Sequence, residues 1–317
     1  MTDLKKAKME EKIKIAIIGS GPAAYSAALY SQELMPVMFE GKFIGSNGPG
    51  GQLTTTTNVD NYPGVPNIEG SDLMKNMKEQ AKKTKKIEIK PETITKIIKK
   101  GNDFILETEN NIFISESVII STGAQAKRMY VKGTHDDEFW NKGVSACAVC
   151  DGWLFQDQTV AVIGGGDSAM EETIYLSSIA KKIFLIHRSE NFRARKDLLS
   201  KVKALKNVEI KTNSVLIEAL GDETLKEIKI KSGEEEKILN VDGLFFAIGH
   251  KPNAGFVEIV EKHENGYIKT DSECKTNVEG IFACGDVQDF KYRQAITAAS
   301  SGSIAAISAK KFLDCNK

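Results

Sequence analysis

The segment Ile13–Ala24, IKIAIIGSGPAA, decides how the first part of this chain folds. Its apolar, β-branched run predicts a buried strand, and the small residues that continue to Gln32 predict a helix. The glycines between them let backbone N–H groups and a helix N-terminus approach a pyrophosphate. The next strand ends at Glu40, 21 positions after Gly19, where a carboxylate can accept a hydrogen bond from a ribose hydroxyl. The segment therefore indicates a dinucleotide-binding unit, with a ligand-free tight turn as the alternative.

The same arrangement recurs in the middle of the chain. The run TVAVIG leads into the glycines of Gly164–Ala169 and the helix-compatible MEETIYLSS, and KKIFLIHRS predicts the matching second strand. A chain with this unit twice is expected to bind two dinucleotides, one in each domain.

The ends of the two second strands differ in charge. The first ends at Glu40, whereas the second ends at His187 and Arg188, with Arg193 and Arg195 close behind. Arginines would pair with a 2′-phosphate that a carboxylate would repel. The charges favour FAD or NAD in the first unit and NADP in the second. The alternative is that the arginines are surface residues of a turn and bind no phosphate.

Between these units lies CAVCDG, Cys147–Gly152. Cysteines three positions apart share a helix face and can close a small disulfide ring. At a helix N-terminus the partial positive charge favours the thiolate, and Asp151 could carry the proton that thiol exchange needs. The alternatives are half a zinc site or two unconnected core cysteines. The other three cysteines stand alone in the sequence, so we expect a redox pair and no metal.

Length and charge narrow the class of protein. With 317 residues the chain can form two domains, and 43 basic residues balance 43 acidic ones, so neither nucleic acid nor a membrane surface is an expected partner. No apolar run approaches the roughly 20 residues of a membrane span. Residues 1–12 are mixed in charge and are expected to form a solvated tail rather than a signal peptide. Few cysteines and one redox pair suit the reducing cytoplasm.

Other segments of the first unit suggest how it continues. Glycines and hydroxyls in 48–57 suit backbone wrapping around a polar ligand, although a plain Thr-rich loop would look similar. The helix expected over 71–86 has a Lys-rich face that we interpret as solvated. Short alternating segments over 87–120 predict an antiparallel excursion, and 118–124 returns as a buried strand before the domain boundary.

The last third of the chain has three informative segments. Residues 207–240 predict a second β excursion. A buried strand then ends at Gly285-Asp286, where Asp286 can bind a sugar hydroxyl or cap a helix. Arg293–Thr297 opens a helix of small residues whose N-terminus can stabilise negative charge on a reduced flavin.

Five motifs, in this order, resemble those of the low-molecular-weight thioredoxin reductases, which are class II pyridine nucleotide-disulfide oxidoreductases: GSGPAA, GGQLTTTT, CAVCDG, GGGDSAMEE followed by HRSENFRA, and GDVQDFKYRQAITAA. Glutathione-reductase-like enzymes instead carry CxxxxC shortly after the first glycine turn, where this chain has no cysteine. The resemblance covers almost the whole chain. It implies an α/β fold of two Rossmann-like, three-layer (ββα) domains, with an NADPH domain (126–251, carrying the CxxC pair) inserted into an FAD domain (13–125 and 252–317).

The resemblance also implies a reaction. Hydride passes from NADPH to FAD, then electrons pass to the Cys147–Cys150 disulfide and to thioredoxin. Cys150 would face the flavin, Cys147 would attack thioredoxin and Asp151 would be the acid/base. Because nicotinamide and disulfide lie in one domain, they must take turns at the flavin, so domain rotation about 123–133 and 247–252 is expected. A homodimer is expected from the family.

Motif position assigns the cofactor residues. For FAD they are Gly19, Ser20, Gly21, Pro22, Ala23, Glu40, Gly41, Gly51, Gln52, Leu53, Asn61, Gly123, Asp286, Arg293, Gln294 and Ala295. For NADPH they are Gly164, Gly166, Asp167, Ser168, His187, Arg188, Arg193, Ile248 and Gly249. Ser189 stands where the family usually has a second basic residue, which weakens the argument for NADP. A reductase of another disulfide carrier and a flavin redox sensor without turnover are the alternative functions.

Overall fold

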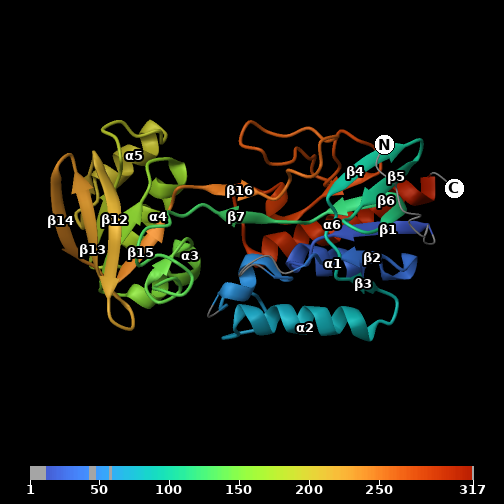
Figure 1. Cartoon of the computed structure of the whole chain (residues 1–317), viewed down its shortest axis with the longest axis horizontal. Helices are drawn as coiled ribbons and strands as arrows, with labels where there is room; N and C mark the ends of the chain where they lie inside the picture. Colours follow the sequence, from blue (N-terminus) through green and yellow to red (C-terminus); the bar gives the residue numbers. More distant parts are fainter. Residues whose placement is uncertain (1–11, 43–47, 57–58, 316–317) are drawn as a thin grey trace. The chain divides into compact units, whose positions relative to one another are not determined.

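The computed structural model describes residues 12–42, 48–56 and 59–315, which form two compact units (Figure 1). Unit 1 comprises Met1–Gln125 and Lys251–Lys317, and unit 2 comprises Ala126–His250. Unit 2 is therefore an insertion in the sequence of unit 1. The predicted solvated tail, apart from Lys12, lies outside the described residues, as does the last residue of the predicted 48–57 loop.

Unit 1 is built on a seven-stranded sheet of order β3-β2-β1-β6-β5-β4, with β17 also pairing with β6. The strands are β1 (Ile13–Ile18), β2 (Val37–Phe39), β3 (Glu88–Lys90), β4 (Lys96–Lys100), β5 (Asp103–Glu107), β6 (Ile112–Ile120) and β17 (Ile281–Ala283). Strands β1, β2, β3, β6 and β17 are parallel, and β4 and β5 are antiparallel additions. The predicted antiparallel excursion over 87–120 is thus β4 to β6, whereas β3 extends the parallel sheet.

Alternate residues of these strands build two cores, one on each face of the sheet. Ile15, Ile17 and Met38 pack against the helices α1 (Pro22–Tyr30), α2 (Gly70–Lys83) and α6 (Ala295–Cys315). Ala16, Ile18 and Phe39 pack on the opposite side with residues of β4 and β5. This is the period-2 alternation of a strand buried on both faces. The short 3₁₀ helices are η1 (Gln32–Leu34), η2 (Gly51–Thr55) and η4 (Gly285–Val287).

Unit 2 repeats the plan with a five-stranded parallel sheet of order β11-β10-β9-β15-β8 and a three-stranded antiparallel sheet. The parallel strands are β8 (Val144–Ser145), β9 (Thr159–Ile163), β10 (Lys182–Ile186), β11 (Val208–Lys211) and β15 (Gly243–Phe246). The antiparallel strands are β12 (Ser214–Gly221), β13 (Leu225–Ser232) and β14 (Glu235–Asn240). The β excursion predicted over 207–240 therefore contributes its first strand to the parallel sheet.

The parallel sheet of unit 2 is the middle of three layers. Val160, Val162 and Leu185 face a core that includes residues of α4 (Asp167–Ser177) and α5 (Lys196–Lys203). The alternate residues Ala161 and Ile163 face a core shared with β12 and β13. The remaining helices of the unit are α3 (Ala148–Asp151) and η3 (Gly152–Phe155).

The chain passes between the units in two short strands, β7 (Ala124–Ala126) and β16 (His250–Pro252), which pair with each other. Gly123 and Gly249, which precede these strands, have positive φ angles of 68° and 93°. The predicted fold class, α/β with two Rossmann-like domains of three layers, is confirmed.

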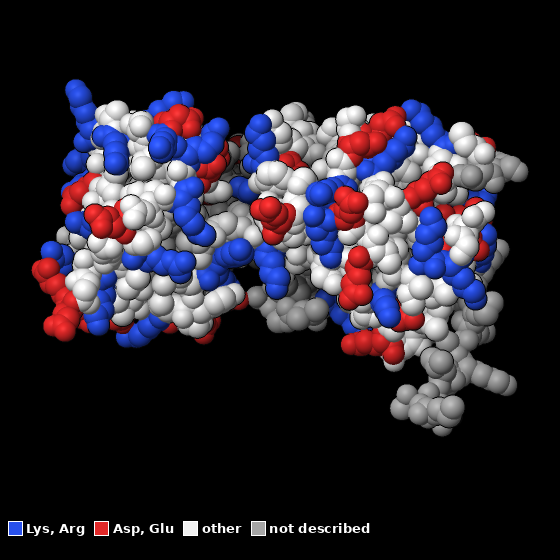
Figure 2. Space-filling model, turned by 90° about the horizontal axis from the view of Figure 1, so that it is seen from above, with Lys and Arg blue, Asp and Glu red and all other residues white. Residues whose placement is uncertain are grey.

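Charges of both signs are interspersed over the face drawn in Figure 2. This pattern agrees with the balance of 43 basic and 43 acidic residues. Among the described helices, none is long and apolar enough to cross a membrane.

Candidate redox and nucleotide sites

The cysteine pair lies where β8 gives way to a helix. Cys147 is the N-cap of α3, and its Sγ accepts a hydrogen bond of 3.2 Å from the backbone N–H of Cys150. The two residues form a disulfide, with Cα atoms 5.3 Å apart, and both are half-buried. The predicted pairing at the first turn of a helix is therefore what the structure shows. Within the described residues no group of His, Cys, Asp or Glu is arranged to hold a metal ion.

Asp151 is tied to this turn through Ser145, the last residue of β8. The Ser145 hydroxyl donates to the Asp151 carboxylate and accepts a hydrogen bond of 3.1 Å from the backbone N–H of Cys147. Burial raises the pKa of Asp151, and the hydrogen bond from Ser145 offsets part of that rise. A carboxyl group with a raised pKa keeps its proton closer to neutral pH, which suits a proton donor beside a thiol.

The other cysteines differ from this pair. Cys274 and Cys284 are buried free thiols, and Cys315 is exposed. Burial, with a smaller contribution from Asp271, raises the pKa of Cys274 to about 11, and burial also raises the pKa of Cys284. Buried thiols of raised pKa are poor nucleophiles, so Cys274 and Cys284 are unsuited to thiol exchange.

The second glycine turn follows β9 and shares the carboxyl edge of the sheet with the cysteine pair, because β8, β15 and β9 are parallel neighbours. A Cβ atom on Gly164 would lie 2.4 Å from the carbonyl oxygen of Ala247, and one on Gly165 would overlap the ring of His187. A Cβ on Gly166, the N-cap of α4, would meet no atom of the part of the chain that the structure describes within 4 Å. The first two glycines therefore serve packing, and the third leaves open space at a helix N-terminus.

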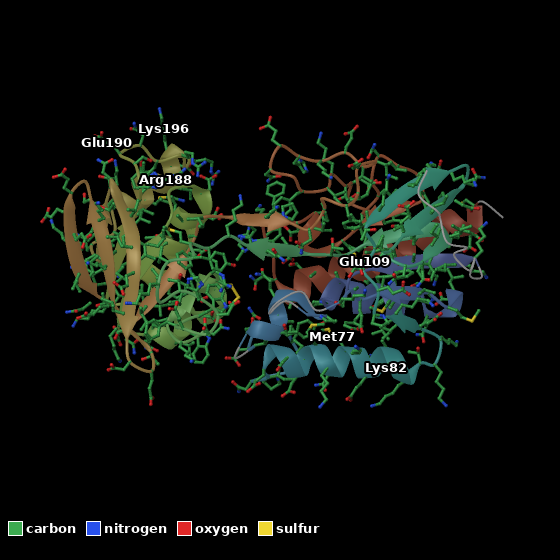
Figure 3. The ribbon with its side chains drawn as sticks, viewed as in Figure 1. Met77, Lys82, Glu109, Arg188, Glu190 and Lys196 are labelled. Carbon is green, nitrogen blue, oxygen red and sulfur yellow. A yellow bond between two sulfur atoms is a disulfide. The ribbon has the colours of Figure 1, made fainter. Side chains whose placement is uncertain are left out.

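The loop after β10 closes over this turn. The His187 ring is buried, stacks on Phe192 at 4.7 Å, and has its Nε2 3.2 Å from the carbonyl oxygen of Asn191. The backbone N–H of Arg193 donates to the carbonyl oxygen of Gly165 at 2.8 Å. The side chains of Arg188 and Arg193 are exposed, and Arg188 lies near α5 with Glu190 and Lys196 (Figure 3). The loop thus brings exposed arginines to the glycine turn, whereas the buried His187 ring packs against Gly165 of that turn.

The other residues predicted to bind NADPH lie on the same edge. Asp167 and Ser168 begin α4, and Asp167 accepts a hydrogen bond of 2.7 Å from the backbone N–H of Arg195 and pairs with its guanidinium at 3.5 Å. Ile248 and Gly249 follow the end of β15, and the Gly249 carbonyl accepts from the N–H of Lys127 at 2.8 Å. Strands β8, β9, β10 and β15 thus all deliver predicted residues to one edge.

In unit 1 the glycine turn between β1 and α1 is just as closely packed. Gly19 has φ 130°, and a Cβ atom on it would lie 2.2 Å from the carbonyl oxygen of Ser121. Gly21 is the N-cap of α1, and Pro22 is its first residue. A Cβ on Gly21 would meet none of the described residues within 4 Å. Proline suits this first position because its missing N–H would be unpaired in any helix. Backbone N–H groups of the first turn are left to face a ligand.

Ser20 connects this turn with two other segments. Its hydroxyl donates to the carbonyl oxygen of Glu40 at 3.0 Å and accepts from the backbone N–H of Gly50 at 2.9 Å. Gly41 follows Glu40 with φ 82°. Gly51, Gln52 and Leu53 lie in η2 directly after Gly50. The wrapping loop predicted from its glycines is thus attached to the glycine turn.

The Glu40 carboxylate has a partner that the sequence did not indicate. Lys78 of α2 places its Nζ 3.0 Å from Oε1 and 2.7 Å from Oε2 of Glu40. The Lys-rich face of α2, interpreted from its sequence as solvated, therefore includes one lysine that turns to the sheet edge. The 38 positions between these residues leave no local pattern from which the pair could be found.

The C-terminal residues of the predicted FAD site converge on the same edge. β17 leads into η4, which contains Asp286, and the backbone N–H of Gly285 donates to the Ser301 hydroxyl at 2.9 Å. Gln294 lies just before α6, which begins at Ala295, and accepts from the Asn61 side-chain amide at 3.2 Å. Arg293 has a left-handed backbone, φ 49°. Gly123, with φ 68°, follows β6. Residues from both sequence segments of unit 1 thus line one edge of its sheet.

The residues present fit the dinucleotides that the sequence predicts. In each unit an uncovered glycine, Gly21 or Gly166, caps a helix that starts at the carboxyl edge of a parallel sheet. Ligands of such sheets bind outside this edge, with phosphates at the helix N-terminus. Which residues contact which cofactor stays a prediction.

Known proteins share this organisation. The family model described as "Pyridine nucleotide-disulphide oxidoreductase" matches residues 13–302. Thioredoxin reductase 2 of Arabidopsis thaliana is 45% identical over 316 residues, which covers 95% of this chain and 82% of the relative. The chain belongs to the thioredoxin reductases of this family. The resemblance seen in the five motifs is thereby confirmed, as is the predicted class of enzyme.

Solved thioredoxin reductases agree with this assignment. The structure from Giardia duodenalis has a TM-score of 0.90 and 36% identity, covering 96% of this chain and 100% of that one. The structure from Lactococcus lactis, in what is called the FR conformation, has a TM-score of 0.64 and 35% identity, covering 95% and 99% of the two chains. Both have the thioredoxin reductase fold that this chain adopts.

The carboxyl group of Asp286 is expected to make the stability of the protein depend on pH. Burial raises its pKa to about 7, with Asp289 adding to the rise and Arg293 opposing it. In the unfolded chain an aspartate titrates near pH 4. Between about pH 4 and pH 7 the native state keeps a proton that the unfolded state loses, so stability falls as pH rises through this window and levels off above it.

We therefore expect Asp286→Asn to change the stability of the flavin-free, full-length protein in a pH-dependent way. At pH 8 the variant should be more stable than the wild type by a few kcal/mol, and near pH 4 the difference should vanish. Urea denaturation at several pH values measures this, with the exposed Glu264→Gln as control. A difference that is constant with pH would show that Asp286 does not titrate in this window.

Proposed function

We propose that this chain is an NADPH-dependent, FAD-containing reductase of thioredoxin. The observation that carries the proposal is the Cys147–Cys150 disulfide at the sheet edge that also carries the second glycine turn. FAD bound in unit 1 would supply the two-electron chemistry that links NADPH to this disulfide. The match to thioredoxin reductases along 95% of the chain supports thioredoxin as the final acceptor.

Unit 1 is proposed to hold FAD. The N-terminus of α1, uncovered at Gly21, would bind the pyrophosphate, and Glu40 would accept hydrogen bonds from the adenosine ribose. Asp286, at the end of β17, would bind a hydroxyl of the sugar alcohol. The start of α6 would favour negative charge near the flavin because a helix N-terminus carries partial positive charge.

Unit 2 is proposed to hold NADPH. The N-terminus of α4, uncovered at Gly166, would bind the pyrophosphate. Exposed Arg188 and Arg193 are available to a 2′-phosphate, and the bond from the Arg193 backbone to Gly165 keeps this loop against the glycine turn.

The reduced cysteines would then exchange electrons with thioredoxin. The Cys147 thiolate attacks one sulfur of the thioredoxin disulfide and forms a mixed disulfide, while the other thioredoxin sulfur leaves as a thiolate. Cys150 then attacks Cys147, which restores their disulfide and releases the second thioredoxin sulfur. Asp151, held by Ser145, would donate a proton to a leaving thiolate. Two thiols of this chain are oxidised and two thioredoxin thiols are formed.

One unit carries both the disulfide and the NADPH site, so these groups must approach the flavin of unit 1 in turn. Rotation about the two chain crossings, 123–133 and 247–252, is the proposed means. The crossings contain few residues, and Gly123 and Gly249 supply backbone conformations that other residues adopt at a cost.

A homodimer is also proposed, formed through α6 and the end of α1. Ile304 and Ile307 of α6 are 38% and 41% exposed, and Tyr30 at the end of α1 is 54% exposed. The contact between α1 and α6 is extensive, so these apolar side chains belong to one packed pair of helices. Apolar surface of this kind is typical of interfaces. Sedimentation equilibrium that finds only a monomer would contradict the dimer.

The proposed compartment is the reducing cytoplasm. Cys274, Cys284 and Cys315 are free thiols, and the one disulfide joins neighbours that act in exchange. This use of cysteine suits a compartment in which structural disulfides do not persist.

Replacing either cysteine of the pair should abolish thioredoxin reduction. We expect Cys147→Ser and Cys150→Ser to lower the rate of NADPH oxidation with oxidised thioredoxin by more than about 100-fold, because one sulfur cannot complete the exchange. Both variants should still bind FAD, measured by the visible flavin spectrum. Cys315→Ser, at an exposed free thiol, should retain wild-type turnover. Full activity in either pair variant would refute the proposed reaction.

The basic loop should select NADPH over NADH. Arg188→Ala combined with Arg193→Ala is expected to raise KM for NADPH about 10- to 100-fold, as expected when charge-assisted bonds to a phosphate are lost. KM for NADH should change by less than about twofold. The exposed Lys203→Ala on α5 serves as control. An equal loss with both nucleotides would mean that these arginines do not read the 2′-phosphate.

A further inference from the structure

The ion pair of Glu40 and Lys78 is unusually enclosed for a pair of charged side chains. The Glu40 side chain is 9% exposed and that of Lys78 31% exposed. Nearby Lys42 and Glu109 also pair, at 2.8 Å, but are 49% and 69% exposed. An exposed pair of the second kind contributes little. A carboxylate as buried as Glu40 needs a partner, because an unpaired buried charge is costly.

Glu40 lies at a junction of three segments. It directly follows β2, and its carbonyl oxygen accepts from the Ser20 hydroxyl of the glycine turn. Its carboxylate is held by Lys78, in the middle of α2, and α2 packs against η2. The backbone of Glu40 is therefore positioned by the glycine turn, and its side chain is positioned by α2.

The bond to Lys78 involves both carboxylate oxygens. With Nζ at 3.0 Å from one oxygen and 2.7 Å from the other, the ammonium group fixes the orientation of the carboxylate plane. Each carboxylate oxygen has about two acceptor positions, so both oxygens can still accept from a ligand. A ribose offers two neighbouring hydroxyl donors, and an oriented carboxylate can accept from both. The geometry is that of a hydrogen-bond acceptor whose orientation is fixed before the ligand binds.

We propose that Lys78 is a positioning residue for the adenosine end of the flavin, acting through Glu40. This inference rests on the proposed function of unit 1 as the FAD domain. Lys78 itself need not contact the cofactor. Its effect should be confined to flavins that carry the adenosine ribose, because its ammonium group bonds the Glu40 carboxylate and no other group among the described residues.

A merely structural role for Lys78 predicts something different. If the ion pair only attached α2 to the sheet, its loss would loosen η2 and the glycine turn as well. All flavins would then bind more weakly, whether or not they carry adenosine. Comparing FAD with FMN, which lacks the adenosine half, separates the two roles.

The test is titration of flavin-free, full-length protein with FAD and with FMN, monitored by flavin fluorescence. Lys78→Met should raise the Kd for FAD about tenfold or more, the effect of losing a charged hydrogen-bond partner, and leave the Kd for FMN within about twofold. Lys78→Arg should have a Kd for FAD within about threefold of the wild-type value, because Arg keeps the charge and the donors.

Matched controls come from the same helix and from Glu40. Lys82, toward the C-terminal end of α2, is exposed (Figure 3), and Lys82→Met should bind both flavins like the wild type. Glu40→Gln should weaken FAD but not FMN, and adding Lys78→Met to it should cause no further loss. A double variant that loses additional FAD affinity would show that Lys78 acts independently of Glu40, against the proposal.

The remaining outcomes are decisive. Equal weakening of FAD and FMN in Lys78→Met, or no weakening of FAD, would overturn the positioning role. Unchanged FAD binding in Glu40→Gln would overturn the proposed ribose contact and with it the role of Lys78. Loss in Glu40→Gln without loss in Lys78→Met would leave the FAD site intact and reject only Lys78.

Discussion

The common direction of the parallel strands is the constraint on which both candidate sites depend. Parallel strands end at the same edge of a sheet, so residues that follow different strands meet there however far apart they are in sequence. In unit 1, β1, β2, β6 and β17 bring Gly19, Glu40, Gly123 and Asp286 to one edge. In unit 2, β8 and β9 do the same for the cysteine pair and the glycine turn. The insertion of unit 2 does not disturb unit 1, because β17 returns in register beside β6.

Glycines at these edges serve two different needs. Gly19 and Gly164 allow backbones to approach, because an added Cβ would lie 2.2 and 2.4 Å from a neighbouring carbonyl oxygen. Those at Gly21 and Gly166 face open space within 4 Å. No contact with the described residues requires the absence of a side chain at the latter two positions. Room for a ligand at the helix N-terminus is the physical reason that remains.

The sequence predicted features that depend on neighbouring residues, but not features that depend on contacts between distant segments. The glycine turns and the helix at Cys147 are local, so strand, turn and helix patterns were sufficient to place them. The Glu40–Lys78 pair depends on how α2 is rotated over the sheet, and sequence periodicity assigned Lys78 only to a polar face. The direction of β3 depends on the crossover through α2, which short alternating patterns do not reveal. Ser145 precedes the cysteines in a strand whose sequence has no distinctive pattern. Its role, holding the Asp151 carboxylate, is visible only in the folded structure.

Each unit places a carboxylate close to its glycine turn, and each pairs it with a cation from another segment. Glu40 is held by Lys78 of α2, and Asp167, the first residue of α4, is held by Arg195. An unpaired carboxylate at either place would oppose the partial positive charge of the helix N-terminus and repel a pyrophosphate. With Lys78 in place, the enclosed Glu40 carboxylate keeps its hydrogen-bonding oxygens while much of its field is cancelled. The side chains of Asp167 and Arg195 are 46% and 61% exposed, so solvent screens this second pair and it contributes less. The two units thus pair these carboxylates with residues from unrelated segments, so the repeat of strand, glycine turn and helix does not extend to the pairs.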